Sequence, residues 1–171
     1  GVETINIAGW NATFADTASD TLTLSDTAVR SQNGSDAIDT VKLAGSNVTF
    51  GGGSTDASSF KANSVAVASA QRIAVNGIVD IIGANGLSLS GSDVTVNGTI
   101  QAKKIALAAS AADVSLKNTS HLAASGGVAG TNTITITANA GTIAANGSMS
   151  ADSITLSGKE IETGGTMSAD G

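Results

Sequence analysis

The chain lacks cysteine, proline and tyrosine altogether, and aromatic residues occupy only 2% of its 171 positions. Without cysteine it cannot form disulfides, thiol nucleophiles or zinc–thiolate sites. Because large side chains are so few, the core has to be thin and filled by Ile, Val, Leu and Ala. A chain of this length can still bury such a core as one domain without metals or disulfides.

Positive charge and long apolar runs are also scarce. The net charge is −6, and residues 1–60 carry seven acidic side chains against only Arg30 and Lys42. A nucleic-acid-binding protein needs a basic surface, which is missing here. No apolar run approaches the roughly 18 residues of a membrane span, and the opening "GVETINIAGW" lacks the segments of a signal peptide. We therefore expect no nucleic-acid partner, no membrane span, and a chain that is a mature product or part of a longer one.

One phrase recurs along the sequence, as "SDVTVNGTI" (92–100), "ADVSLKNTS" (112–120) and "ADSITLSGK" (151–159). Pairs of apolar residues separated by one position recur in steps of 17, 19, 24, 22, 18, 29 and 20 residues. Such a period is the mark of a repeat architecture. The pairs are Ile5/Ile7, Leu22/Leu24, Val41/Leu43, Val65/Val67, Leu87/Leu89, Ile105/Leu107, Ile134/Ile136 and Ile154/Leu156.

Most phrases contain two further apolar positions, which predict a second and a third strand. The second set is Val48/Phe50, Ile73/Val75, Val94/Val96, Val114/Leu116, Ile143 and Ile161. The third set is Phe60, Ile100, Leu122, Met149 and Met167. The spacing is that of strands, β-branched residues dominate, and Asn-Gly, Gly-Gly or Ser-Gly separates the segments. Helical patterning is absent.

These features predict an all-β fold, a parallel β-helix of about eight coils with three short strands in each coil. At about 4.8 Å per coil the rod would be roughly 40 Å long. Inward residues should stack as Leu87, Ile105, Ile134 and Ile154, and outward ones as Ser88, Ala106, Thr135 and Thr155. Gly and Asn at the corners are expected to supply positive φ.

We expect residues 1–171 to form a single solenoid segment, with irregular acidic coils over 1–60 and regular coils over 61–171. Two steps are overlong, and they contain "GGGSTDASSF" (51–60) and "HLAASGGVAG" (121–130). Insertions in a solenoid leave the rod as corner loops, where binding surfaces are often mounted. The plainer alternative is a tolerated spacer loop at each place.

Two long stretches, "GLSLSGSDVTVNGTIQAKKIALAASAADVSLKN" and "TITITANAGTIAANGSMSADSITLSG", resemble the repeats of filamentous-haemagglutinin-type adhesins, exoproteins of bacterial two-partner secretion. The resemblance covers residues 61–171 well and 1–60 loosely, and it is one of repeat style without an invariant motif. It implies a right-handed β-helix, export through an outer-membrane partner of a Gram-negative bacterium, and a role at the cell surface or in biofilm. The secretion-domain motifs of the family are not visible, so the resemblance places this piece in a shaft region.

Catalytic side chains are few. Asp93 and Asp113 occupy the same place in "SDVTV" and "ADVSL", and should therefore lie about 5 Å apart on adjacent coils. Retaining glycosidases use carboxylates at a similar separation. Both residues precede a strand, however, where Asp commonly serves a turn, and Lys103 or Lys104 could neutralise them. His121 is the sole histidine and has no Asp near it in sequence, so we expect a solvated corner residue and no catalytic triad.

The residue pattern suggests two kinds of ligand or modification site. Calcium is a possible cofactor, because acidic residues cluster in the first third, at Asp16, Asp20, Asp26, Asp36 and Asp39. The Gly-Gly-x-Gly-x-Asp repeat of calcium-binding β-rolls does not occur, which favours a solvated acidic surface. Six Asn-x-Ser/Thr triplets are possible glycosylation acceptors, although turn Asn followed by strand Thr produces the same pattern. They begin at Asn11, Asn33, Asn47, Asn97, Asn118 and Asn146.

The function expected from the sequence is structural and non-enzymatic: the rigid shaft of a secreted bacterial adhesin or extracellular filament. Its partners would be neighbouring repeats of a longer chain or end-to-end copies, and a surface polysaccharide or host ligand. The alternative is a carbohydrate-binding or carbohydrate-cleaving β-helix, of the tailspike or autotransporter-passenger kind. Such a protein needs a groove lined by acids and aromatics, and with Trp10 as the sole Trp the sequence favours the shaft. Threonines as in "TNTITIT" (131–137) also suggest ice binding, but the outward residues do not form a regular Thr array.

Overall fold

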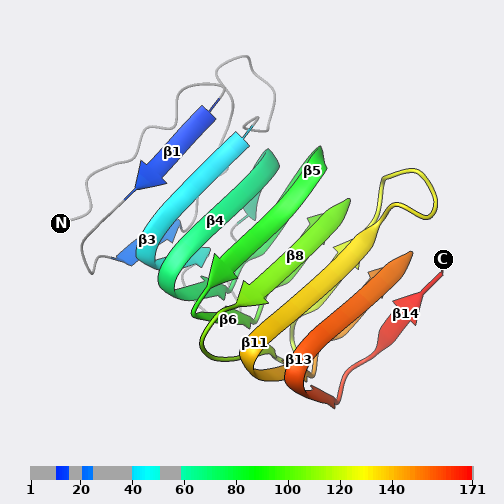
Figure 1. Ribbon diagram of the computed structural model, residues 1–171. Coiled ribbons are helices and arrows are strands. Elements are labelled where there is room, and N and C mark those ends of the chain that lie inside the picture. The colour runs from blue at the N-terminus through cyan, green and yellow to red at the C-terminus, as the bar shows by residue number, and fades with distance from the viewer. Residues whose placement is uncertain (1–10, 16–20, 25–39, 51–58, 171) are drawn as a thin grey trace.

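The computed structural model describes residues 11–15, 21–24, 40–50 and 59–170, and these form strands and turns without any helix. The strands stack side by side as rungs from β1 to β13 and β14 (Figure 1). Their bounds are β1 Asn11–Ala15, β2 Thr21–Leu24, β3 Thr40–Phe50, β4 Ser59–Val75, β5 Ile78–Gly91, β6 Asp93–Val96, β7 Thr99–Ala102, β8 Lys104–Ala109, β9 Val114–Leu116, β10 His121–Ala124, β11 Thr133–Ala145, β12 Ser148–Ala151, β13 Ser153–Thr163 and β14 Met167–Ala169. All the described pairings are parallel, as a solenoid requires.

The pairings divide the solenoid into three faces. The first face contains β1, β8 and parts of β3, β4, β5, β11 and β13. The second contains β2, β6, β9 and the later parts of β3, β4, β11 and β13. The third contains the starts of β4 and β5, then β7, β10, β12 and β14. The expected parallel β-solenoid is confirmed.

The register within each face follows the apolar positions of the sequence. On the first face Val41 pairs with Val65, and the ladder continues through Leu87, Ile105, Ile134 and Ile154. On the second face, Val48, Ile73, Val94, Val114, Ile143 and Ile161 form one ladder. On the third, Phe60, Val79, Ile100, Leu122, Met149 and Met167 do the same. The predicted stacking of these residues is confirmed, and Val79 is an addition that the pattern did not reveal.

Among the described residues, which do not include the expected first pair Ile5/Ile7, the number of turns is smaller than expected. Six strands in five successive pairings make up the third face, so the described residues complete about five turns instead of eight. The sequence pattern predicts a separate coil for Leu22 and Leu24 in the first ladder, and this prediction is wrong. In the structure they pair with Val48 and Phe50 on the second face. A pair of apolar residues looks alike on any face, and only the partner strand distinguishes the faces.

Several strands are longer than the three short segments expected in each coil. The 17 residues of β4 pair on all three faces, while β3, β11 and β13 cross from the first face to the second. Irregularities of register mark the corners, as between Gly45 and Asn47 or between Ala138 and Thr142. The chain bends at such irregularities without leaving the extended conformation, because a bulge turns a strand while neighbouring residues stay paired.

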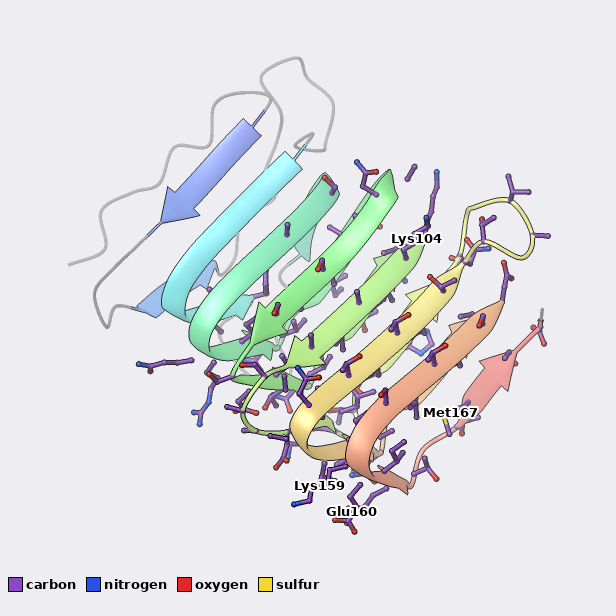
Figure 2. The ribbon with its side chains drawn as sticks, in the orientation of Figure 1. Lys104, Lys159, Glu160 and Met167 are labelled. Carbon is purple, nitrogen blue, oxygen red and sulfur yellow. The ribbon has the colours of Figure 1, made fainter. Side chains whose placement is uncertain are left out.

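The core is a narrow column of aliphatic side chains. Leu87, Leu107 and Ile134 are at most 1% exposed, and the same holds for most residues of the three ladders. In β13, Ile154 and Leu156 are only half-buried, although they pack against this column. Ile161 is 44% exposed and Met167, labelled in Figure 2, is 42% exposed. Burial therefore falls at the last described coil, although the pattern of alternation continues into it.

Some corners require glycine for a different reason from the positive φ that was expected. Among the described glycines, positive φ occurs only at Gly86, Gly126 and Gly130. The corner residue Gly98 instead lies so close to the coil beside it that an added Cβ would collide with the carbonyl oxygens of Gly77 and Asn76. Gly165 has the same relation to the carbonyl of Gly147. Close stacking of the backbones thus requires glycine at Gly98 and Gly165, whereas the expected positive φ is found at Gly86.

Candidate functional site

Asp93 and Asp113 lie on adjacent rungs, but each is engaged with a different neighbour. They precede Val94 and Val114, which pair in register on the second face. The Asp93 carboxylate accepts a hydrogen bond from Arg72 Nε at 3.1 Å. Asp113 Oδ1 accepts from the backbone N–H of Thr142, on the following coil, at 2.7 Å. Both carboxylates therefore hold neighbouring coils together, through partners 21 and 29 residues away in the sequence.

His121 contacts a serine on the next coil. It is the first residue of β10 and pairs with Ser148 of β12, and His121 Nδ1 lies 2.6 Å from Ser148 Oγ. A histidine beside a serine hydroxyl is part of the arrangement of a serine hydrolase. The described hydrogen bonds give His121 no carboxylate to orient its ring, and the pair is exposed on the third face. The geometry thus provides two members of a triad without the third.

The corner near 121–130 begins later than the sequence pattern suggested. Residues 121–124 belong to β10, and an ordered loop of residues 125–132 follows, which projects from the stack in Figure 1. Asn132 closes the loop, because its side-chain Oδ1 accepts from the backbone N–H of Gly127 at 2.7 Å. Thr131 Oγ1 donates to the carbonyl oxygen of Val128 at 2.6 Å. Val128 itself is 76% exposed, which makes it the most exposed large apolar side chain of the described residues.

Asp152 is the residue that fixes this loop, although the sequence pattern did not single it out. Its Oδ2 accepts from the backbone N–H of Asn132 at 3.0 Å and from Asn132 Nδ2 at 2.9 Å. The backbone hydrogen bond from Asn132 is the main cause that lowers the pKa of Asp152, and N–H groups of Gly130 and Thr131 act in the same direction. The signal was available in "SADS", since Asp152 precedes a strand as Asp93 and Asp113 do. Its partner, however, is 20 residues away.

The possible glycosylation acceptors differ in accessibility. Asn118 and Asn146 are exposed at corners, whereas Asn97 is half-buried and its Nδ2 donates to Asn76 Oδ1 at 2.7 Å. Asn11 lies in β1 and Asn47 in β3. Asn33 lies outside the described residues, as do the acidic residues proposed for calcium, Asp16, Asp20, Asp26, Asp36 and Asp39. In the described ranges, no three His, Asp or Glu side chains gather closely enough to hold a metal ion.

The outer surface of the first face carries small polar and apolar residues. Ser88, Ala106, Thr135 and Thr155 occupy one column in register, as expected. The neighbouring column contains Ser90, Ala108, Thr137 and Ser157. Lys104 stands at the start of β8, and Lys159 and Glu160 at the bend of β13 (Figure 2). The alternation of Ser, Ala and Thr does not make the regular Thr array that ice binding would require.

The described part of the chain contains no helix that could cross a membrane. Comparison of the chain with protein-family models, with curated protein sequences and with solved structures found no match.

Proposed function

We propose that this chain is a segment of the rigid shaft of a secreted bacterial adhesin or extracellular filament. One observation carries the proposal: the same three apolar ladders run in register through about five turns, while the outward columns of the first face contain only small residues, Ser, Ala and Thr. Each coil binds its neighbours through backbone pairing and through contacts such as Arg72–Asp93. This construction resists bending, since every rung is paired along three faces.

The proposal extends to the setting of the shaft. The coil is right-handed, which agrees with the strong preference of parallel crossover connections for that hand. The protein is exported to the surface of a Gram-negative bacterium, in line with the resemblance of its repeats. Its partners are further coils of the same kind, either in one longer chain or in end-to-end copies. The exposed Ile161 and Met167 of the last described coil supply apolar surface for such a neighbour.

The carbohydrate-active alternative has less support from the described contacts. A retaining glycosidase needs one carboxylate free to attack and another free to protonate. Asp93 is paired with Arg72, and Asp113 accepts from a backbone N–H. Phe50 is 1% exposed and offers no stacking platform for a sugar ring. We therefore keep the structural role as the proposal.

An engineered deletion tests the shaft. Removal of residues 104–132 takes out β8, β9 and β10 and joins position 103 to Thr133, which stacks on Lys104. The register is preserved, so the shortened chain should fold into a rod about 4.8 Å shorter. When the chain holds a grafted binding domain away from a bacterial surface, this deletion should change only the distance between the domain and the surface, which becomes shorter. The matched control replaces Ser88, Thr135 and Thr155 by Gln and keeps the length.

The opposite pattern would contradict the proposal. If cells that display the chain alone attach to polysaccharide or to host cells, and the triple Gln variant abolishes the attachment, the surface is a ligand site. Turnover of a polysaccharide that is lost in Asp93→Asn or Asp113→Asn would establish the enzymatic alternative.

A further inference from the structure

We propose that Asn146 is a site of spontaneous deamidation, which the fold leaves reactive while it protects the asparagines of the equivalent corners. Four Asn-Gly dipeptides lie in the described residues, at 76–77, 85–86, 97–98 and 146–147. Three of them occupy the same corner, between the second and third faces, on successive or nearby coils. The inference depends on how these otherwise similar corners are hydrogen-bonded, and it is independent of the shaft function.

Deamidation needs a free backbone N–H after the asparagine. The Gly147 nitrogen loses its proton and attacks Cγ of Asn146, a C–N bond forms, and ammonia leaves to give a succinimide. Water then opens the ring to aspartate or isoaspartate, so that one water is consumed, one ammonia is released, and no oxidant is needed. A glycine nitrogen that already donates a hydrogen bond is held away from this attack, because the bond must first be broken.

The protected corners show such hydrogen bonds. At Asn76–Gly77, the Phe50 carbonyl accepts from both backbone N–H groups, at 2.7 and 3.1 Å. At Asn97–Gly98, the Val75 carbonyl accepts both, at 2.8 and 3.0 Å. The Asn97 side chain also donates to Asn76 Oδ1, and Thr119 Oγ1 donates to the Asn97 carbonyl at 2.9 Å. Neither the glycine nitrogens nor these side chains can move freely.

The corner at Asn146 departs from this arrangement. The Leu116 carbonyl accepts from the Asn146 N–H at 3.0 Å, but the Gly147 N–H has no hydrogen-bond partner among the described residues. The cause lies in the corner of the adjacent coil, which makes a longer turn. The Ser120 N–H donates a hydrogen bond to the Lys117 carbonyl at 2.9 Å and closes this turn. The two corners do not match in length. The Ser120 hydroxyl, buried without a partner against Gly147, reflects the same mismatch.

The Asn146 side chain is exposed, so it can rotate into the reactive position. Asn85 is exposed as well, but it lies within β5, where Gly86 pairs with Ser64 and packs closely against Lys104. We expect Asn85 to react slowly for this reason. Of the four described Asn-Gly pairs, only 146–147 combines an exposed asparagine with an unbonded glycine N–H outside a strand.

Modification at this position should loosen the next coil. An added Cβ on Gly164 would lie 2.5 Å from Asn146 Oδ1, and one on Gly165 would collide with the Gly147 carbonyl. Isoaspartate adds an atom to the main chain in this tightly stacked corner. Backbone amides of β13 and β14 should therefore exchange hydrogen faster after the reaction, while those of β8 stay unchanged.

The experiment incubates the full folded chain at mildly alkaline pH and follows each asparagine by peptide mass spectrometry. Asn146 should gain the deamidation mass at least about tenfold faster than Asn76 or Asn97, because those must first open locally. In urea the three rates should converge, and Asn146→Gln should remove the signal at this position without changing the others. The proposal is overturned if Asn97 reacts as fast as Asn146 in the folded chain. It is equally overturned if Asn146 stays intact in the folded chain but reacts in urea, or if Asn97 remains slow in urea.

Discussion

Substitution by Asp distinguishes the inward positions of the strands, in the narrow core, from the outward positions on the surface. Leu107 of β8 is 1% exposed, whereas Thr135 lies on the neighbouring rung of β11 with its side chain exposed. Leu107→Asp would place a charge in the aliphatic column with no polar partner, and should cost about 3–5 kcal/mol of unfolding free energy. Thr135→Asp should change it by less than about 0.5 kcal/mol. Urea denaturation of the two variants measures both values, and similar losses would show that the assigned faces are wrong.

The corner glycines provide a second test at the same scale. Gly98→Ala would force a Cβ against two carbonyl oxygens of the adjacent coil, and should destabilise the protein by about 1–3 kcal/mol. Gly126→Ala is the control, because its φ is +84° but nothing lies within 4 Å of the added atom. Its backbone strain is confined to the loop, so thermal unfolding should shift less than in Gly98→Ala. The reverse order would mean that backbone conformation governs the corners.

At the scale of elements, the loop of residues 125–132 depends on one carboxylate. Asp152 accepts two hydrogen bonds from Asn132, and Asn132 in turn holds Gly127. Asp152→Ala should release the loop, and Asp152→Asn should release it in part, because an amide oxygen can still accept. NMR of the Val128 methyl groups would report the change as narrower, averaged signals. Unchanged signals in Asp152→Ala would show that the loop is held by its own internal bonds.

The same contact predicts a dependence of loop order on pH. Hydrogen bonds to the ionised form, first of all from the backbone N–H of Asn132, lower the pKa of Asp152 below the ordinary value of an aspartate. Because the pKa of Asp152 is lower in the folded loop than in the unfolded chain, its carboxylate stabilises the folded loop fully at pH values above the pKa of the unfolded state. This stabilisation is lost as the pH falls through the lower pKa of the folded state. The Val128 signals should therefore stay constant from neutral pH down to about 4, and change only in more acidic solution. A change near neutral pH would point to a different group.

At the scale of the whole molecule, isoleucines of one ladder should contribute different amounts to the free energy of unfolding, depending on their place along the rod. Ile134 is 0% exposed in β11, whereas Ile154, its partner in β13, is half-buried in the last described coil. Ile134→Ala should cost about 2–5 kcal/mol, the range for buried aliphatic truncations. Ile154→Ala should cost less than half as much, since fewer contacts are lost. Chemical denaturation at low protein concentration measures both.

An equal loss in the two variants would mean that something covers Ile154 in solution. End-to-end copies are the proposed cover, and light scattering over a range of concentrations would then show association. In that case the cost of Ile154→Ala should fall on dilution, because the covering copy dissociates.

The sequence by itself determined the class of fold and the phase of the ladders. Alternation with period 2 is a local property, and the apolar pairs from Val41/Leu43 to Ile154/Leu156 could be aligned without knowing their neighbours. What the tertiary structure decided are the properties that depend on contacts about 20 residues apart. It placed Leu22 and Leu24 on the second face, joined Asp93 to Arg72, and gave Asp152 the loop to hold. It also left Gly147 without the hydrogen bond that Gly98 makes, because the length of one corner matters only against the corner of the adjacent coil.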